Sequence, residues 1–335
     1  MVTIKEVAAL AGVSTATVSR VLNGQGGAAP ARARVMDAVQ QLGYRPNGVA
    51  RSLRQSGTRT LGLVISDLLN PFFTELARAV EDEARAFGLS LIIGNADERA
   101  EQLDHYVEVL LQRQVDGLLA VPTADQSPLL DEAVRRGAPL VLIDRDLPGA
   151  DVPVVRSDSV PAVHELVDHL VRLGHRRIAI IAGPQRLVTG HERLTAFRDA
   201  LDGHGLALPD AYVRVGDFQQ VSGSVATAEL LDLPQPPSVI FAADDLMGLG
   251  AMHEIRRRRL VVPDEIALAV FDDSPWFPLV DPPITAIAQR TDEMGRVAVR
   301  QLLARMAGDP AESRLLPCRL IVRSSCGARR GSHDE

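Results

Sequence analysis

From about Thr60 onward the chain alternates short apolar segments with amphipathic ones, and this alternation limits the possible folds more than any other feature. Segments such as 61–67 and 116–122 are rich in Leu, Val and Ile and too short for helices, which is typical of strands buried on both faces. The segments between them, for example 74–87, carry apolar residues at the spacing of one helical face. Strands that alternate with helices form parallel sheets covered on both sides. The sequence therefore predicts an α/β fold for most of the chain.

The alternation begins again near Val160, which predicts a second α/β half similar to the first. A strand at 284–289, a helix at 291–307 and a strand at 317–326 then indicate a late return to the first half. Two halves linked in this way form two hinged lobes with a cleft between them. The other expected elements are strands at 89–97, 139–145, 176–184, 212–218, 238–245 and 266–273, and helices at 99–113, 127–136, 160–173, 190–204, 221–232 and 246–258.

The N-terminal segment contains two short helical patterns separated by a glycine. In 3–11 the apolar residues fall at positions i, i+3, i+4 and i+7, which is one face of a helix. Gly12 allows a sharp turn, and Ser14 is suited to cap a second helix over 15–22. This pattern is typical of a helix-turn-helix, whose second helix enters the major groove of DNA, but an ordinary helical hairpin has the same pattern.

The distribution of charge favours the DNA-binding alternative. Residues 1–60 hold eight basic side chains and two acidic ones, a charge of +6, whereas the whole chain carries −7. A basic head on an acidic body indicates that only the head meets a polyanion. A third helix from Pro30 to about Leu42, ended by Gly43, would complete a three-helix headpiece, although the loop before it lacks a polar capping residue.

A short segment at 48–54 has helical character but is too short to be stable alone, so we expect it to fold only when something holds it. The last residues have the composition of a disordered tail. The expected boundaries are a headpiece at 1–46, a hinge and linker at 47–59, a two-lobed unit at 60–327 and a tail at 328–335, with lobe 1 at about 60–158 and 289–316 and lobe 2 at about 159–288 and 317–327.

Composition and motifs exclude several other classes. No apolar run reaches the roughly 18 residues of a membrane span, and the chain starts directly in an amphipathic helix, so we expect a cytoplasmic protein without a membrane partner. Cys318 and Cys326 lack metal-ligand spacing and are expected to be free thiols. The common nucleophile, zinc and phosphate-loop motifs do not occur, so neither enzymatic activity nor a cofactor or metal is expected.

Polar residues follow several of the expected strands. Ligands of parallel α/β sheets bind beyond the carboxyl ends of the strands, so this recurrence predicts a polar small-molecule cleft. Each aspartate taken alone is equally suited to cap the helix that follows it. The residues are Asp67, Asn95, Asp97, Asp144, Arg145, Asp158, Asp244 and Asp272.

Segments spread along nearly the whole chain resemble, in the same order, those of the LacI/GalR family of bacterial transcriptional regulators. The family's headpiece is similar to TIKEVAALAGVSTATVSRVLNG, its hinge to LGYRPNGVARSLR and the start of its ligand-binding core to LGLVISDLLNPFF. Further similar segments follow in the family's order: VDGLLAVP, HLVRLGHRRIAIIAGP, ERLTAF, FAADDLMGLGA, VPDEIALAVFDD and DPPITAIAQ. The resemblance implies a helix-turn-helix headpiece with a hinge helix, followed by an α/β two-lobed core like that of periplasmic binding proteins.

The resemblance also implies a homodimer on double-stranded, pseudo-palindromic operator DNA. Arg20 is the best candidate for reading a base, because a guanidinium can contact guanine O6 and N7 together. Leu53 matches a leucine that family members insert between central base pairs, the alternative being an apolar residue packed within a linker. The residues expected to contact DNA are Thr3, Ser14, Thr15, Ala16, Thr17, Ser19, Arg20, Asn23, Tyr44, Asn47, Arg51 and Leu53.

A small-molecule effector between the lobes is the second implication. Phe218 is suited to stack on a ring, and Arg193 with Asp272 to bind adjacent hydroxyls, which favours a sugar or sugar derivative. A nucleobase or nucleoside is the alternative, although Leu187 stands where a nucleobase-binding relative has arginine. The candidate effector residues are Phe72, Phe73, Asp97, Arg145, Asp158, Thr189, Arg193, Phe218, Asp244, Asp272 and Gln289, and the phenylalanines are equally suited to plain core packing.

We therefore expect a transcriptional repressor whose operator affinity a ligand controls by changing the orientation of the lobes and the pairing of two hinge helices. The alternative function is a sugar-binding protein that does not bind DNA. The basic headpiece speaks against it, because such a protein needs none. Two departures from the family pattern affect the cleft: Val270 stands where glycine is usual, and Asp244 replaces a common asparagine and makes the pocket more acidic.

Overall fold

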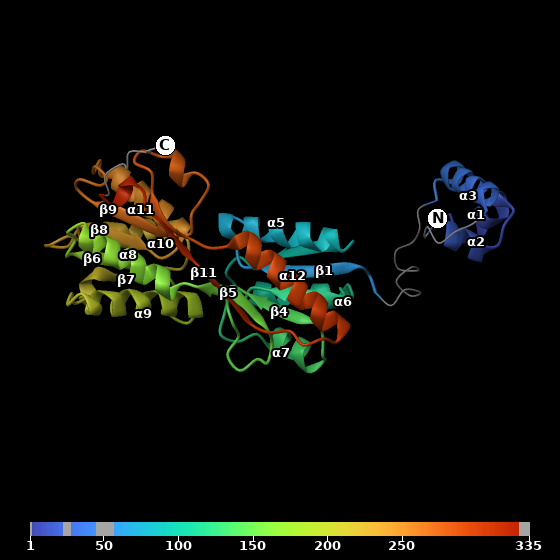
Figure 1. The fold of residues 1–335 in the computed structure, drawn as a ribbon, viewed down its shortest axis with the longest axis horizontal. Helices are drawn as coiled ribbons and strands as arrows, with labels where there is room; N and C mark the ends of the chain where they lie inside the picture. The colour runs from blue at the N-terminus through green and yellow to red at the C-terminus, as the bar shows by residue number, and fades with distance from the viewer. Residues whose placement is uncertain (1, 23–27, 45–56, 328–335) are drawn as a thin grey trace. The chain divides into compact units, whose positions relative to one another are not determined.

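A computed structural model describes residues 2–22, 28–44 and 57–327, in two compact units, Met1–Thr58 and Arg59–Glu335 (Figure 1). Some predicted features lie outside the described residues: the hinge helix at 48–54, the tail at 328–335, and Asn23, Asn47, Arg51 and Leu53. What was predicted for them stays a prediction.

The N-terminal unit is a helix-turn-helix with a third helix, which confirms the predicted fold class. Its helices are α1 (Ile4–Ala11), α2 (Thr15–Leu22) and α3 (Ala29–Leu42). Gly12 turns the chain in the left-handed conformation at φ 63°. The Ser14 hydroxyl then accepts the N–H of Thr17 at 3.2 Å and so caps α2, as predicted. Val7, Val18 and Val35, one from each helix, are fully buried and form the centre of the small core.

Two six-stranded sheets form the second unit within residues 57–327. The first sheet has the order β11 (Arg314–Pro317), β5 (Val154–Asp158), β4 (Leu140–Ile143), β3 (Gly117–Ala120), β1 (Thr60–Ile65) and β2 (Ser90–Asn95). The second has the order β12 (Arg319–Ile321), β10 (Thr285–Ala288), β9 (Ala267–Phe271), β8 (Val239–Ala242), β6 (Ile178–Ala182) and β7 (Val213–Val215). The strand pairs are parallel except β10 with β12, so the prediction of parallel sheets is confirmed.

Helices cover both faces of each sheet. On the first sheet, α5 (Pro71–Ala86) and α12 (Thr291–Ala307) pack on one face, and α6 (Ala100–Gln112) and α7 (Pro128–Arg135) on the other. On the second sheet, α8 (Val160–Arg172) and α9 (Val188–Gly203) pack opposite α10 (Gln220–Leu231) and α11 (Asp245–Arg257). Each central strand therefore buries both faces, which explains its continuous apolar sequence.

The chain differs from the predicted elements in two places that matter for the site. The helix expected at 74–87 begins at Pro71, because the Asn70 side chain accepts the N–H of Phe72 at 2.8 Å and caps the helix. The prediction of a single strand at 317–326 is wrong. It is replaced by β11 in the first sheet and β12 in the second, so one segment passes directly between the two lobes.

Cys318 and Cys326 are free thiols, as predicted. Among the helices of the described residues, none has the length and apolar character to cross a membrane.

Candidate functional site

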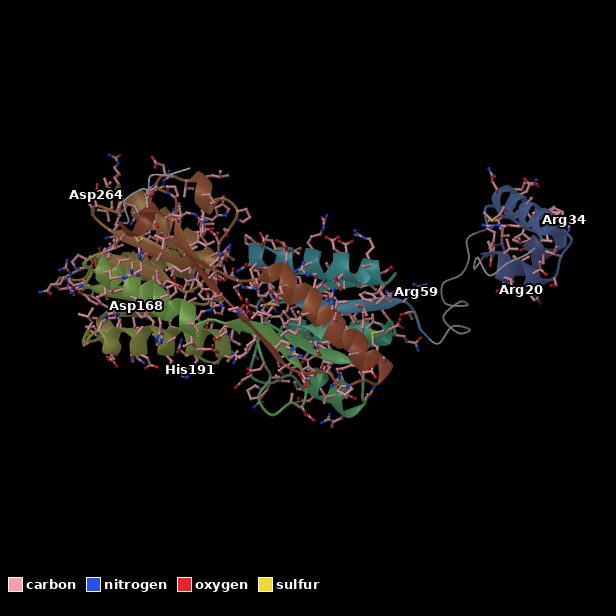
Figure 2. The ribbon with its side chains drawn as sticks, viewed as in Figure 1. Arg20, Arg34, Arg59, Asp168, His191 and Asp264 are labelled. Atoms are coloured by element: carbon pink, nitrogen blue, oxygen red, sulfur yellow. The ribbon has the colours of Figure 1, made fainter. Side chains whose placement is uncertain are left out.

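The exposed face of α2 carries the residues predicted to meet DNA. Thr15, Ala16 and Arg20 are exposed, Thr17 and Ser19 are half-buried, and the opposite face of the helix is buried through Val18 and Val21. Figure 2 shows the Arg20 side chain at the surface of this unit. Ser14 is also exposed, at the start of the helix, whereas the Thr3 hydroxyl is engaged with Glu6 in the cap of α1. Tyr44 is half-buried against the small core.

Arg20 has no ion-pair partner among residues 2–22 and 28–44. Its guanidinium therefore keeps all of its donors for an external acceptor. A short helix with small polar side chains and one unpaired arginine on its exposed face has the chemistry of a DNA recognition helix.

A small cavity of about 20 Å³ lies between the two lobes of the second unit. It is enclosed by side chains that follow the carboxyl ends of strands in both sheets, as ligand sites of this fold require. Nine of the predicted effector residues line it: Phe72, Phe73, Arg145, Thr189, Arg193, Phe218, Asp244, Asp272 and Gln289. Asp144, predicted at this cleft from its place after a strand, lines it as well, and so do Asn70 and Glu98, which were not predicted.

Two predicted residues are not brought to this cavity. Asp97 is exposed and has a left-handed backbone (φ 56°), and its neighbour Glu98 turns inward instead. Two consecutive left-handed residues break the strand alternation, so the sequence pattern did not show which of the two acids faces the cleft. Asp158 is half-buried at the end of β5, where its carbonyl accepts the N–H of Cys318 at 3.3 Å.

Arg145 is buried at the cavity between the lobes. Its guanidinium makes two hydrogen bonds of 2.7 Å to the Glu98 carboxylate and lies 5.9 Å from the ring centre of Phe73 and 5.3 Å from that of Phe218. Phe218 belongs to the second lobe, so this cation–π contact joins the lobes. A bidentate pair with two aromatic neighbours holds Arg145 in one orientation.

Arg193, on α9, is the second cation at the cavity. It is 5% exposed, donates to the Ala243 carbonyl at 2.8 Å, and its guanidinium lies 3.5 Å from the ring centre of Phe271. Burial raises the pKa of Asp144, Asp244 and Asp272, and the charge of Arg193 opposes this rise at each of them. The positive charge of Arg193 therefore stabilises the ionised form of three buried carboxyl groups.

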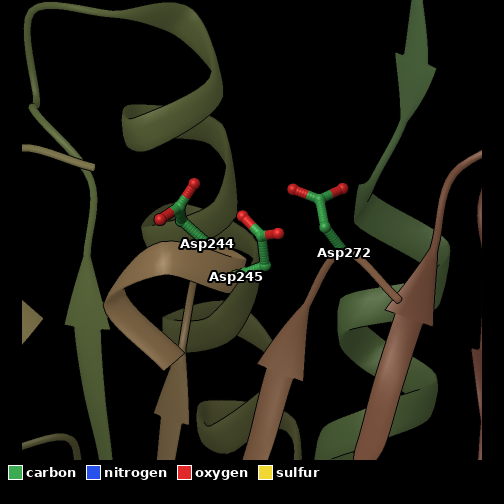
Figure 3. A group of neighbouring side chains, drawn as sticks. All are labelled: Asp244, Asp245 and Asp272. Atoms are coloured by element: carbon green, nitrogen blue, oxygen red, sulfur yellow. The ribbon is translucent and has the colours of Figure 1, made fainter. Parts of the chain in front are cut away.

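Three aspartates form a compact cluster at the ends of β8 and β9 (Figure 3): one carboxylate oxygen from each of Asp244, Asp245 and Asp272 lies within 4.8 Å of the others. Burial and then the neighbouring Asp245 raise the pKa of Asp244 well above its usual range. Burial raises the pKa of Asp272 to about 7 against the opposing effect of Arg193. Asp244 also caps α11 by accepting the N–H of Met247 at 2.9 Å.

Polar contacts connect the two lobes around the cavity. Asn70 Nδ2 donates to Asp244 Oδ2 at 3.2 Å, and Gln219 Nε2 donates to Asp67 Oδ2 at 3.0 Å. Asp67 thus lies at the boundary between the lobes, although not on the cavity. These bonds and the Arg145–Phe218 contact join the lobes around this small cavity. A larger cavity of about 700 Å³ is lined by α5 and α12 of the first lobe and by Ala288 and Arg319 of the second sheet.

A three-helix unit with an exposed recognition helix, followed by a two-lobed α/β unit with a polar site between its lobes, defines the class of ligand-binding transcriptional regulators. Residues 3–47 match "Bacterial regulatory proteins, lacI family", and residues 167–326 match "Periplasmic binding protein-like domain". The HTH-type transcriptional repressor CytR of Escherichia coli (strain K12) is 36% identical over 97% of this chain and 96% of that protein. The chain belongs to the lacI family of DNA-binding bacterial regulatory proteins.

Solved structures show the same likeness. The lac repressor dimer bound to operator and the anti-inducer ONPF matches with a TM-score of 0.86 and 30% identity, over 98% of this chain and 99% of that one. The complex of the transcriptional regulator CelR with cellobiose matches with a TM-score of 0.74 and 33% identity, over 97% of this chain and 100% of that one.

Proposed function

We propose that this protein is a dimeric repressor of transcription whose affinity for a pseudo-palindromic operator is controlled by a polar small molecule, a sugar or sugar derivative, bound between the lobes. The observation that carries the proposal is the cavity at the strand ends, because both lobes contribute side chains to it. A ligand held by both lobes couples its own binding to their relative orientation.

The chemistry of the cavity supports a sugar. Asp244 and Asp272 are suited to accept hydrogen bonds from hydroxyls, Arg193 to donate to ring and hydroxyl oxygens, and Phe218 to offer an apolar face. The Thr189 hydroxyl is buried with no partner among the described residues and is suited to complete such a set. The related CelR structure holds cellobiose. A nucleobase or nucleoside is the alternative outcome of the test below. Against it, Leu187 is 3% exposed and lies in an apolar cluster.

Ligand binding requires the lobes to separate or Arg145 to move. Small-molecule sites typically enclose about 300–1,000 Å³, whereas this cavity has about 20 Å³. The effector therefore binds a different lobe arrangement more tightly than this one. Such a difference in affinity is the thermodynamic condition for control of the operator-binding state.

The edge strands of both sheets support a dimer. The edge strand β2 exposes Ile92 and Ile93, and the edge strand β7 exposes Val215. Apolar side chains exposed on an unpaired edge favour association with another chain. On α10, next to β7 in the same lobe, Val221 and Val225 are exposed as well. We assign these apolar positions to contact with a second copy of the chain, because a symmetric operator is bound by a symmetric dimer.

Arg20→Ala should weaken binding to the preferred operator by about 1–3 kcal/mol and remove the preference at one symmetric pair of base positions. Arg34→Ala is the matched control, because Arg34 is an exposed arginine on α3 of the same unit (Figure 2). Selection of operators from random DNA, followed by anisotropy titrations, measures both effects. Equal losses on all DNA sequences for the two variants would show that Arg20 does not read a base.

A further inference from the structure

A second small cavity, of about 40 Å³, lies beside the effector cavity and is strongly acidic. Glu75 reaches it from α5 in the first lobe, while Asp245, Asp272 and Asp273 reach it from the second lobe. Asp273 is already neutralised by two hydrogen bonds from Arg323, of 2.7 and 2.8 Å. Within the described residues, the Asp245 carboxylate accepts a hydrogen bond from the Ser274 hydroxyl and forms no ion pair with a basic side chain.

Two buried oxygen atoms at this cavity lack hydrogen-bond donors. Asp245 is 1% exposed, and its Oδ1 accepts no hydrogen bond from the described residues. Gln289 Oε1 is also buried without a partner, while its Nε2 donates to Asp272 Oδ1 at 2.6 Å. The Asp245 carboxylate is fixed, because its other oxygen accepts the Ser274 hydroxyl at 2.6 Å. Buried acceptors without donors are costly, so this pair of atoms points to a bound ligand, and the acidic surroundings favour a positively charged one.

The spacing of the carboxylates fits a metal ion. Calcium binds oxygen at about 2.3–2.6 Å, so two of its ligands are separated by at most about 5 Å. One oxygen each from Asp244, Asp245 and Asp272 meets this condition, since all three lie within 4.8 Å of one another (Figure 3). Organic cations such as an ammonium group bind carboxylates as well, and the test below includes one so that the two kinds of ligand can be told apart.

We propose that Asp244, Asp245 and Asp272 bind one hard divalent cation, with Gln289 Oε1 as an additional ligand and Glu75 facing it from the other lobe. Calcium is preferred over magnesium, because calcium accepts an irregular set of oxygen ligands, whereas magnesium demands near-ideal octahedral geometry. Since Asp244 and Asp272 also line the effector cavity, the ion links the effector site to the contact between the lobes. The site does not depend on the identity of the effector or on the DNA-binding role.

The test uses the full-length protein, freed of metal with a chelator and titrated calorimetrically with CaCl₂, MgCl₂ or methylammonium chloride at constant ionic strength. We expect one calcium per chain, weaker binding of magnesium, and a rise in Tm with calcium. Asp245→Asn should weaken calcium binding at least about tenfold. The control Asp264→Asn, which changes an exposed carboxylate of the same lobe, should leave it unchanged (Figure 2).

Asp245→Asn also removes like-charge repulsion within the cluster, so without calcium its Tm should equal or exceed that of the parent protein. If this variant fails to fold, Asp244→Asn replaces it, because asparagine caps a helix as well as aspartate does. The proposal is overturned if calcium at about 10 mM, which exceeds the dissociation constants of the weakest protein calcium sites, gives neither heat of binding nor a shift in Tm. It is also overturned if both variants bind calcium as the parent does, or if methylammonium binds as tightly as calcium.

Discussion

Arg193→Met is expected to abolish effector binding and to lower the free energy of unfolding by about 3–5 kcal/mol, the usual cost of removing one partner from a buried set of charges. Arg193 is the cation that faces Asp244 and Asp272, because Arg145 is committed to Glu98. Methionine keeps much of the volume and the contact with Phe271 but leaves the carboxylates without this charge. Denaturant unfolding and ligand titration measure the two effects.

Arg198→Met is the matched control, since Arg198 lies on the same helix, is exposed, and has no ion pair among the described residues. It should change stability by less than about 0.5 kcal/mol. If Arg193→Met were as stable as Arg198→Met and still bound the effector, Arg193 would not be the counterion of the buried acids.

Gly250→Ala is expected to lower the free energy of unfolding by at least about 3 kcal/mol, through overpacking against a backbone that cannot yield. A Cβ at Gly250 of α11 would lie 2.1 Å from the Gln220 carbonyl oxygen of α10, and one at Gly223 would lie 2.2 Å from the Met247 carbonyl oxygen. The two helices touch through these glycines. An added methyl group must push them apart and displace the start of α11, where Asp244 and Asp245 lie, so effector binding should weaken as well.

Gly203→Ala provides the comparison, because a Cβ at this helical glycine would meet no atom within 4 Å. Alanine favours the helix over glycine by about 1 kcal/mol, so this variant should be neutral or more stable. Thermal and denaturant unfolding measures the stability of both variants. Equal free energies of unfolding would contradict the close approach of α10 and α11.

The features that local sequence patterns control could be predicted. The two-sheet architecture follows from continuous apolar strands such as β3 and β8, which bury both faces, and the headpiece follows from the turn at Gly12 and the cap at Ser14. The strand ends of this fold gather at one edge, and this pattern brought Arg145, Asp244 and Asp272 into the prediction. The family resemblance supplied the other six residues that line the cavity: Phe72, Phe73, Thr189, Arg193, Phe218 and Gln289. Their roles in binding remain proposals.

What sequence patterns missed depends on contacts between distant segments. Glu98 lines the cavity and pairs there with Arg145, which lies 47 positions further along the chain. Asn70 lies between the predicted strand at 61–67 and the predicted helix at 74–87, but it caps α5 and also reaches Asp244 in the other lobe. The separation of β11 from β12 is decided by pairing with β5 and β10, which no local pattern shows.

The central claim is that a ligand between the lobes controls the affinity of the headpiece for DNA. The most direct test is the dissociation constant for the selected operator with and without the sugar or nucleoside that gives the largest Tm shift in a screen. Coupling of about 1–3 kcal/mol predicts a change of about 5- to 150-fold, and this change should be lost in Arg193→Met. A compound that binds tightly in the cleft and leaves the operator dissociation constant unaltered would contradict the account.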